Sequence, residues 1–286
     1  MKNILSFDIE EHFQVSGLAA AVDRQAWDSQ LSRVEQNTLG LLDLLERASV
    51  KATFFILGWI AERHPKLIEV IAEEKHEIAS HGYDHKLVYD MTAEQFREDN
   101  QRTLELLRAI TGDEIEGYRA PSFSLAEDDI DKFKILSELG YKYDSSLFPM
   151  KHFRYGEASS VPLGPYLIKQ GERTLLREFP MTVVSLFGRR IPAGGGGYFR
   201  LYPDFLLKRN FEIANKDGRP VIVYLHPWEF DPEQPRFRGA GIGNTFRHYY
   251  NLKGTRKKLE RLLRRFEFGP FRDFAKSGPG APPKGQ

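Results

Sequence analysis

The sequence predicts an α/β protein, built as a single parallel barrel or sheet with an inserted β-rich segment around residues 150–202. Three observations carry this prediction. Short apolar strands alternate with amphipathic helices, and no linker-like break interrupts them. The 286 residues, of which 41% are apolar, suffice for one large α/β domain. Polar residues directly follow several of the strands, as they do where a parallel fold builds a site.

The first part of the chain alternates strand and helix regularly. β-Branched and aromatic content identifies the strands, leucine at helical spacing identifies the first helix, and a proline suits the first turn of the second. The expected elements are strand Ile4–Phe7, helix Val34–Ala48, strand Lys51–Leu57, helix Lys66–Glu74 and a strand ending before His81.

Two capping boxes predict where the next helices begin. Thr92 with Gln95 opens one helix and Ser124 with Glu127 opens another, because each pair can satisfy the free N–H groups of a first turn. Glycines then end these helices near residues 112 and 140.

The pattern loosens past residue 148 and becomes regular again near residue 203. Residues 1–270 are expected to form one domain, and the Gly- and Pro-rich tail 271–286 is expected to be disordered. The remaining expected elements are strands Ile115–Tyr118, Lys142–Asp144, Tyr166–Lys169 and Leu175–Phe179, helix Pro203–Ala214, strand Pro220–Leu225 and helix Thr255–Phe266.

Composition excludes several classes of protein. A net charge of +1, without a basic stripe interleaved with aromatics, gives no case for nucleic acid. No apolar run reaches the length of a membrane span, and no signal peptide is visible, so the cytoplasm is the expected compartment. The basic stretch Lys253–Arg265 has an apolar face and predicts a solvated amphipathic helix; contact with an anionic lipid surface or a lipid-linked glycan is the alternative. Nothing in the sequence indicates an oligomeric state.

A pair of histidines is the strongest indication of chemistry. His81 and His85 are four residues apart, which would place both imidazoles on one side of a helical turn. The chain has no cysteine, so a metal must be held by histidine and carboxylate. Asp8, Glu10 and Glu11 follow the first strand and supply carboxylates. Two histidines and one carboxylate leave positions on a divalent ion open for water and substrate, as catalytic sites require.

Two further groups follow predicted strands and would converge on the same face of a parallel barrel. These are Arg119, after one strand, and His226, after a late one. Together with the metal site they supply a candidate for each part of a hydrolysis: a carboxylate to accept a proton from water, and a separate histidine to protonate the leaving group.

These clusters resemble, in order, the motifs of the polysaccharide deacetylases, the NodB-homology or carbohydrate esterase family 4 group. The resemblance covers about residues 3–270 and implies a single deformed (β/α) barrel of the NodB type. Three further stretches, DIEEHF, ATFF and GGGYFR, look most like deacetylases of exopolysaccharide, exosortase-associated loci. The matching motifs are Ser6-Phe7-Asp8, His81-Gly82-Tyr83-Asp84-His85, Arg119-Ala120-Pro121, Asp144 and Tyr224-Leu225-His226.

The resemblance implies a metal centre and a base. His81 and His85 resemble the metal ligands, and Asp8 resembles the general base. The family often has an aspartate directly after the base as its third ligand, but this chain has Ile9 there. Glu10, on the same strand face as Asp8, is therefore the expected ligand, with Glu11 as the alternative. Zinc is the expected ion.

The remaining roles are also carried over from the family. Arg119 resembles the arginine that holds the base by an ion pair, and Ser122 occupies the position whose backbone N–H helps to stabilise the oxyanion. His226 matches the general acid, and Asp144 matches the carboxylate that orients it. The family's usual tryptophan near that carboxylate is missing, and Trp228 is the expected substitute in contact with substrate.

The resulting hypothesis is a metal-dependent hydrolase that removes acetyl from an amino sugar in a polysaccharide or glycan precursor. The segment Phe187–Tyr202 is expected to lie over the metal cleft and to bind the glycan through Tyr198, because its glycines permit close backbone approach and aromatics stack on sugar rings. Three alternatives remain open: hydrolysis of another C–N bond such as a cyclic amide, hydrolysis of O-acetyl esters, and a catalytically silent glycan-binding protein.

Overall fold

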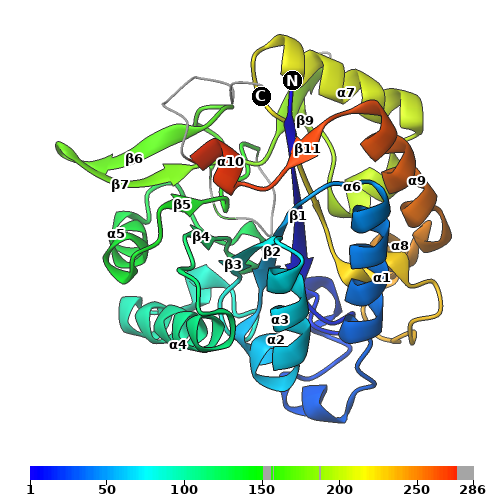
Figure 1. Ribbon diagram of the computed structural model, residues 1–286, viewed down its shortest axis with the longest axis horizontal. Helices are drawn as coiled ribbons and strands as arrows, with labels where there is room; N and C mark the ends of the chain where they lie inside the picture. Colours follow the sequence, from blue (N-terminus) through cyan, green and yellow to red (C-terminus); the bar gives the residue numbers. More distant parts are fainter. Residues whose placement is uncertain (151–155, 157, 187, 276–286) are drawn as a thin grey trace.

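The computed structural model describes residues 1–150, 156, 158–186 and 188–275 (Figure 1). Its strands are β1 Asn3–Ile9, β2 Thr53–Ile56, β3 Glu77–Ser80, β4 Gly117–Tyr118, β5 Tyr143–Asp144, β6 Tyr166–Gln170, β7 Arg173–Glu178, β8 Val183–Leu186, β9 Arg189–Pro192, β10 Ile222–Leu225 and β11 Phe268–Gly269. Its α-helices are α1 Val34–Arg47, α2 Gly58–Arg63, α3 Pro65–Glu73, α4 Ala93–Thr111, α5 Ile130–Leu139, α6 Gly196–Leu201, α7 Asp204–Lys216, α8 Ile242–Tyr249, α9 Leu252–Arg265 and α10 Arg272–Ala275.

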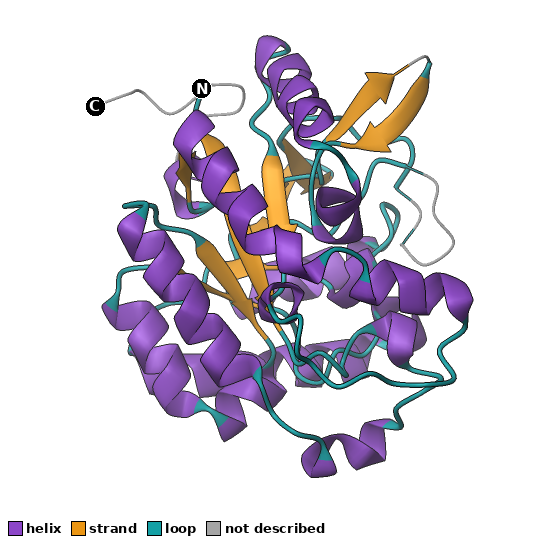
Figure 2. Cartoon of the chain, turned by 90° about the vertical axis from the view of Figure 1, so that its right-hand side faces the viewer, coloured by secondary structure: helices purple, strands orange, loops and turns teal. Residues whose placement is uncertain are grey.

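Nine of the strands form one sheet in the order β10-β1-β2-β3-β4-β5-β7-β6, with β11 beside β1. All pairings in it are parallel except that of β6 with β7. The helices surround the strands (Figure 2). This arrangement confirms the predicted α/β class and the deformed (β/α) barrel, which no pairing between β6 and β10 closes in the described part of the chain. None of the described helices is long and apolar enough to cross a membrane.

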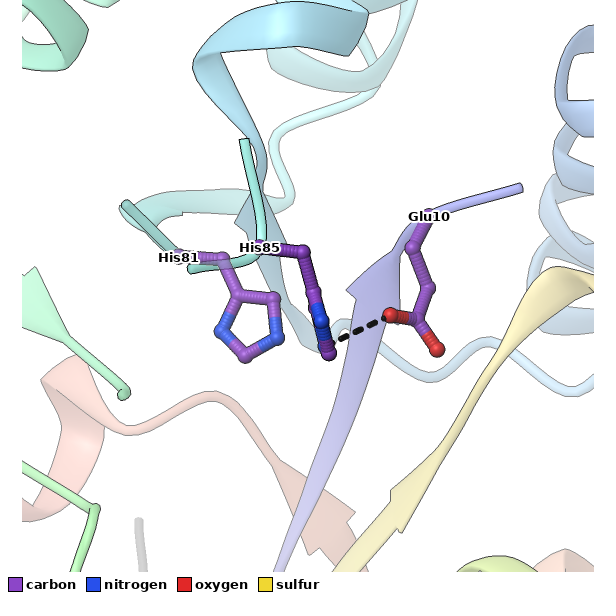
Figure 3. A group of neighbouring side chains, drawn as sticks. All are labelled: Glu10, His81 and His85. Atoms are coloured by element: carbon purple, nitrogen blue, oxygen red, sulfur yellow. Dashed lines mark ion pairs between the residues drawn. The ribbon is translucent and has the colours of Figure 1, made fainter. Parts of the chain in front are cut away.

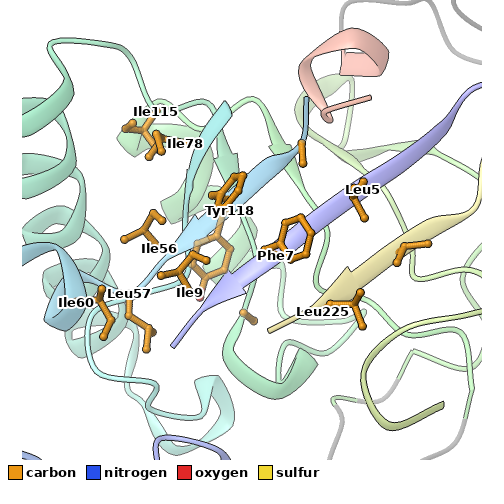
Figure 4. Close-up of a cluster of buried hydrophobic side chains, with 14 of the residues drawn as sticks. Leu5, Phe7, Ile9, Ile56, Leu57, Ile60, Ile78, Ile115, Tyr118 and Leu225 are labelled. Carbon is orange, nitrogen blue, oxygen red and sulfur yellow. The ribbon is translucent and has the colours of Figure 1, made fainter. Parts of the chain in front are cut away.

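The central strand β1 is buried along its whole length. Strands covered on both faces consist mainly of apolar residues, because neither face meets water. Leu5, Phe7 and Ile9 of β1 pack in one cluster with Ile56 of β2 and Leu225 of β10 (Figure 4). The apolar residues of β1 therefore hold the sheet together. Ser6 and Asp8 of the strand, and Glu10 directly after it, are left to point to the other face.

The predicted helix starts hold for α4 but not for α5. Thr92 and Gln95 form the expected capping box, and α4 ends at Gly112 with a positive φ of 71°. Ser124 makes no cap: its hydroxyl donates to the carbonyl of Pro121 and accepts from the backbone N–H of Val88. Helix α5 begins only at Ile130, because these tertiary contacts engage the hydroxyl first.

The predicted β-rich segment is present, and part of it belongs to the main sheet. The antiparallel hairpin β6–β7 joins the sheet because β7 pairs in parallel with β5. Strands β8 and β9 form a separate two-stranded sheet. The segment thus adds two strands to the main sheet and also forms a second, smaller sheet.

The tail was predicted to be disordered from residue 271, but residues 271–275 are packed against the core. Phe271 is fully buried, and its ring stacks on Tyr143 with centroids 5.2 Å apart. Phe274, in α10, is buried as well. These two aromatics anchor residues 271–275 to the core, while residues 276–286 lie outside the described part of the chain.

Candidate functional site

The two histidines lie in the loop after β3, and not on a helical turn as expected. Gly82 and His85 both have positive φ values, of 72° and 58°, so the backbone reverses between the two imidazoles. This reversal turns His81 and His85 to the same side, with ring centroids 5.6 Å apart. A tight loop, and not a helical turn, therefore brings the two imidazoles together. The predicted convergence of His81 and His85 is correct, but the predicted helical conformation of residues 81–85 is wrong.

Glu10, at the end of β1, meets this pair. One ligand atom from each of Glu10, His81 and His85 lies within 4.8 Å of the others, and all three residues are buried. The Nε2 atom of His85 is 3.0 Å from Oε2 of Glu10, and the three side chains point toward one another (Figure 3). Two imidazoles and a carboxylate at this separation are a donor set suited to a divalent ion.

The surroundings of these three side chains fit a metal ligand set. The Nδ1 atom of His81 lies 2.8 Å from the carbonyl oxygen of Arg119, and a bond there leaves Nε2 free for a metal. The indole Nε1–H of Trp228 donates to Oε1 of Glu10 at 3.1 Å. Oε2 of Glu10 is buried and lies against Nε2 of His85, and it accepts no well-aligned hydrogen bond from the residues described. A cation would stabilise a buried carboxylate oxygen in this position.

Glu11, the alternative ligand, is engaged elsewhere. Its carboxylate accepts from the backbone N–H groups of Arg33 at 3.0 Å and Val34 at 3.2 Å, and from the hydroxyl of Ser32. These groups lie at the start of α1, whose free N–H groups favour a negative charge. Glu11 therefore caps a helix, and Glu10 remains as the candidate third ligand.

The ionisation of the cluster suits metal binding. Burial lowers the pKa of His81 to about 4, so its imidazole is neutral at pH 7 and has a lone pair to offer. Burial raises the pKa of Glu10, but the neighbouring imidazoles of His85 and His226 outweigh it and lower that pKa to about 2. Glu10 is therefore anionic under all ordinary conditions.

Asp8 lies two residues before Glu10 on the same face of β1, as predicted. The buried guanidinium of Arg119 donates to Oδ1 of Asp8 at 2.7 Å and to the hydroxyl of Ser6 at 2.9 Å. The same guanidinium donates to the carbonyl of Ser145, so it is held on both sides. Arg119 fixes the orientation of Asp8 and leaves Oδ2 directed toward His226, 3.9 Å from its Nε2.

His226 follows β10 and is oriented by Glu229. Its Nδ1 lies 2.8 Å from Oε1 of Glu229, while Nε2 faces Glu10 at 3.4 Å. The other carboxylate oxygen of Glu229 accepts from the buried Arg200 at 2.6 Å. Burial lowers the pKa of His226, but Glu10 and Glu229 outweigh it and raise that pKa to about 9. His226 therefore carries a proton on Nε2, directed into the site.

Asp144, expected to orient His226, has different partners. Its carboxylate accepts from the hydroxyl of Ser146 at 2.5 Å and from the Ser146 backbone N–H at 3.2 Å. It also shares a hydrogen bond with Glu178, and burial raises the pKa of both carboxyls. The prediction is corrected because the short strand β5 delivers Asp144 beside β7, whereas Glu229 reaches His226 from the same turn.

A sequence signal for Glu229 exists in the stretch HPWE. A proline at the first position of a turn and a glutamate at the third are typical of a helical N-terminus, where the glutamate reaches back to the capping residue. Glu229 does reach back, since it accepts from the backbone N–H of His226 at 3.1 Å. Arg200, at the end of the motif GGGYFR, had no such local signal.

We expect Glu229→Gln to lower kcat roughly 10- to 100-fold, the usual scale for removing the partner of a functional imidazole. Glutamine cannot supply the negative charge that keeps His226 protonated. Asp144→Asn is the matched comparison and should change kcat by no more than a fewfold. Steady-state kinetics with thermal unfolding of both variants checks this: an unchanged kcat in Glu229→Gln would return the role to Asp144.

Ser122 lines the pocket next to the metal cluster, in a strained backbone. Ser122 and Phe123 have positive φ values of 52° and 55°, a region that residues with a side chain rarely adopt. The hydroxyl of Ser122 lies 2.7 Å from that of Ser16. Two consecutive residues in this conformation cost about 1–3 kcal/mol each and tend to occur at functional sites.

Trp228 lines the pocket and also contacts two of its polar residues. Its ring stacks on His226 with centroids 5.1 Å apart and on the buried His248 at 4.2 Å. It also lines the pocket with Asp8, Glu10 and His226. Trp228 therefore orients both Glu10 and His226, while His248 packs behind it and lines the same pocket.

The glycine run 194–197 lies at the pocket, but Tyr198 lies next to it. Gly196 and Gly197 line the pocket, whereas Tyr198 lines a neighbouring surface hollow that shares Gly197. A Cβ at Gly195 would lie 2.3 Å from the ring of Tyr224, so glycine is required there by close packing against β10. Phe187, which begins the predicted substrate segment, lies outside the described residues.

These geometries define a class of site: two histidines and a carboxylate that could hold a metal ion, beside a carboxylate and a histidine that are each held in place by a charged partner. Comparison with known proteins gives the following similarities. Residues 25–143 match the family model "Polysaccharide deacetylase", and residues 145–276 match a domain of unknown function, DUF3473.

Two curated relatives match part of the chain. A peptidoglycan-N-acetylglucosamine deacetylase of Bacillus cereus is 33% identical over 90 residues, 32% of this chain and 33% of the relative. A peptidoglycan deacetylase of Helicobacter pylori is 31% identical over 124 residues, 42% of this chain and 41% of the relative. The chain thus spans less than half the length of these relatives. These comparisons thus show a similarity to polysaccharide deacetylases over less than half of the chain.

Solved structures share the fold along nearly the whole chain. A Mycobacterium smegmatis protein, provisionally named a polysaccharide deacetylase, has a TM-score of 0.59 and 20% identity, with 96% of this chain and 90% of that chain covered. Puue allantoinase also has a TM-score of 0.59, with 16% identity and coverage of 96% and 88%. At such identities the likeness establishes the fold alone, and this fold hosts more than one chemistry.

Proposed function

We propose that the protein is a metal-dependent hydrolase that removes N-acetyl groups from an amino sugar within a polysaccharide or glycan precursor. The observation that carries the proposal is the convergence on one pocket of three units. These are the Glu10, His81 and His85 cluster, the Asp8–Arg119 pair and the His226–Glu229 pair. A binding protein needs neither an oriented acid nor an oriented base.

In this proposal Glu10, His81 and His85 hold one divalent ion, which we take to be zinc. When bound, such an ion supplies a Lewis acid for the acyl carbonyl and makes water a better nucleophile. Asp8 accepts the proton that the attacking water loses, through the carboxylate oxygen that Arg119 does not occupy. Arg119 prevents the carboxylate from rotating away.

His226 completes the reaction by donating its Nε2 proton to the nitrogen of the leaving amino sugar as the C–N bond breaks. Glu229 and Arg200 keep His226 protonated and oriented. The backbone N–H at Ser122 supplies a donor for the oxyanion of the acyl group. Water thus delivers its hydroxyl to the acetyl carbon and one proton, through Asp8, to the protein, while the amine takes a proton from His226.

The names of the two relatives, a peptidoglycan-N-acetylglucosamine deacetylase and a peptidoglycan deacetylase, support this substrate class. The motifs DIEEHF and GGGYFR lead us to propose an exopolysaccharide deacetylase as the subgroup. Opening of a cyclic amide is the second candidate, since Puue allantoinase has an equally similar fold.

The deciding measurement is acetate release from N-acetylated oligosaccharides by the metal-loaded and metal-depleted protein. We expect release only when metal is present. Ring opening of allantoin without acetate release would favour the cyclic amide. Acetate from O-acetylated but not N-acetylated sugars would indicate an esterase, and glycan binding without turnover would indicate a silent protein.

We predict that Tyr198→Ala raises KM on a long glycan far more than on a short N-acetylated fragment, with kcat little changed. Tyr198 lies one residue from the pocket lining, so its ring can contact a sugar next to the one that reacts. Tyr202→Ala is the control for loss of local structure. It removes the ring whose centroid lies 5.9 Å from that of Tyr198. An equal rise in KM on both substrates would contradict a role at a distant sugar.

A further inference from the structure

A row of apolar side chains on α8 faces solvent. Ile242 is 92% exposed, and Phe246, one turn later, is 56% exposed. Tyr250 follows α8 with its ring centroid 4.9 Å from that of Phe246. Leu201, 48% exposed at the end of α6, lines one surface hollow with Phe246 and Tyr250. We call Leu201, Ile242, Phe246 and Tyr250 the apolar patch. Contiguous exposed apolar groups of this kind mark an interaction surface.

The segment that follows the apolar patch is strongly basic. Residues 242–265 hold eight lysines and arginines but one acid, Glu260, although the whole chain has a net charge of only +1. Lys253, Lys257 and Arg264 are exposed on α9, and in the described part of the chain none of the three forms an ion pair. We call these three residues the basic face. Its charge is uncompensated and therefore available to an anionic partner.

The helices that carry the apolar patch and the basic face lie together. Figure 1 places α6, α8 and α9 on the right of the molecule. Gly197 and Arg247 line both the hollow of the apolar patch and the pocket that holds the metal cluster. A surface that covers the patch would therefore lie directly beside the catalytic pocket.

We propose that the apolar patch and the basic face dock this protein on an anionic phospholipid surface. Ile242 and Phe246 enter the boundary between headgroups and acyl chains, and the cations of the basic face contact lipid phosphates. A second copy is a poorer occupant, because a symmetric contact would bring the two basic faces against each other. Docking does not depend on the proposed chemistry, so it is tested without measuring activity.

The test is co-sedimentation of the full chain with phosphatidylcholine vesicles that contain phosphatidylglycerol, and with vesicles of phosphatidylcholine alone. We expect binding at least about 10-fold tighter to the anionic vesicles, falling as salt is added. Ile242→Ser with Phe246→Ser should weaken this binding about 10-fold or more, since both insertions are lost. Lys253→Glu with Lys257→Glu should remove the preference for anionic vesicles.

The matched controls replace apolar residues by serine, or lysines by glutamate, at exposed positions outside the apolar patch and the basic face. Leu31→Ser with Leu39→Ser removes two exposed leucines, and Lys66→Glu with Lys142→Glu reverses two exposed lysines. These variants should bind like the original chain, and thermal unfolding verifies that all variants fold. Absence of anionic vesicle binding, or equal loss in the controls, overturns the proposal. A dimer in sedimentation velocity that Ile242→Ser disrupts, without vesicle binding, would identify a second copy as the occupant instead. Binding of a long glycan that Ile242→Ser weakens, again without vesicle binding, would identify a glycan as the occupant.

Discussion

Replacing His81 or His85 by alanine is expected to weaken binding of one divalent ion by at least about 100-fold. Mutating a residue that only hydrogen-bonds to a metal ligand already lowers metal affinity by about 10- to 100-fold, and here the ligand itself is removed. The imidazoles face one carboxylate in a buried cluster, so the remaining two residues cannot compensate. Metal content after dialysis against a weak chelator, with a titration of zinc into the metal-free variants, measures the loss.

Two glutamates provide a matched pair for this prediction. Glu10→Gln should lose the ion as the histidine variants do, because an amide is a poor substitute for an anionic ligand. Glu11→Gln should keep it and lose stability by roughly 1 kcal/mol, the usual scale for a helix cap. A full equivalent of metal retained in both histidine variants, or lost only in Glu11→Gln, would refute the assignment.

Asp8→Asn is expected to retain the metal and the fold but to lower turnover by roughly two to four orders of magnitude, the usual scale for a general base. Asparagine keeps a carbonyl oxygen that can accept from Arg119, so the buried guanidinium stays paired. Steady-state rates and metal content of the same sample separate the outcomes. Loss of metal together with turnover would make Asp8 a ligand and place the base elsewhere.

His226→Ala should produce a similar loss and also change the pH profile. The raised pKa of His226 means that its proton is present at neutral pH and is lost as the pH rises toward about 9. The rate should therefore fall on the alkaline side in the original protein, and this fall should be absent in His226→Ala. An alkaline limb that survives unchanged in the variant would exclude His226 as the acid.

Regular periodicity made most of the scaffold predictable. Leucine spacing located α1, and the Thr92 and Gln95 box located α4, because both signals are local. Strands β4 and β5 have only two residues each and lie within the predicted strands Ile115–Tyr118 and Lys142–Asp144. Ser124 misled because its hydroxyl is used by a distant backbone N–H.

The site could be predicted for those side chains whose position depends only on where a strand ends. Asp8 and Glu10 share a face of β1, and the loop after β3 brings His81 to them, so their convergence followed from parallel strands. The partner of His226 could not be inferred in this way. Asp144 has the family's order in the chain, but side-chain reach and the contact with Arg200 decide the pairing in favour of Glu229.

The backbone at Ser122 and Phe123 bears on how this protein could be engineered. Ser122→Gly would relieve about 1–3 kcal/mol of backbone strain. This exceeds the roughly 0.4–1 kcal/mol that glycine costs by adding freedom to the unfolded chain, so the melting temperature should rise. Libraries selected for heat resistance alone would therefore enrich glycine at this position. The same change would make the wall of the pocket beside Glu10, His81 and His85 more mobile, so stability would rise at the expense of the geometry that the proposed reaction needs. Selection for a heat-resistant form of the proposed enzyme should keep residues 122 and 123 unchanged and seek stability at other positions.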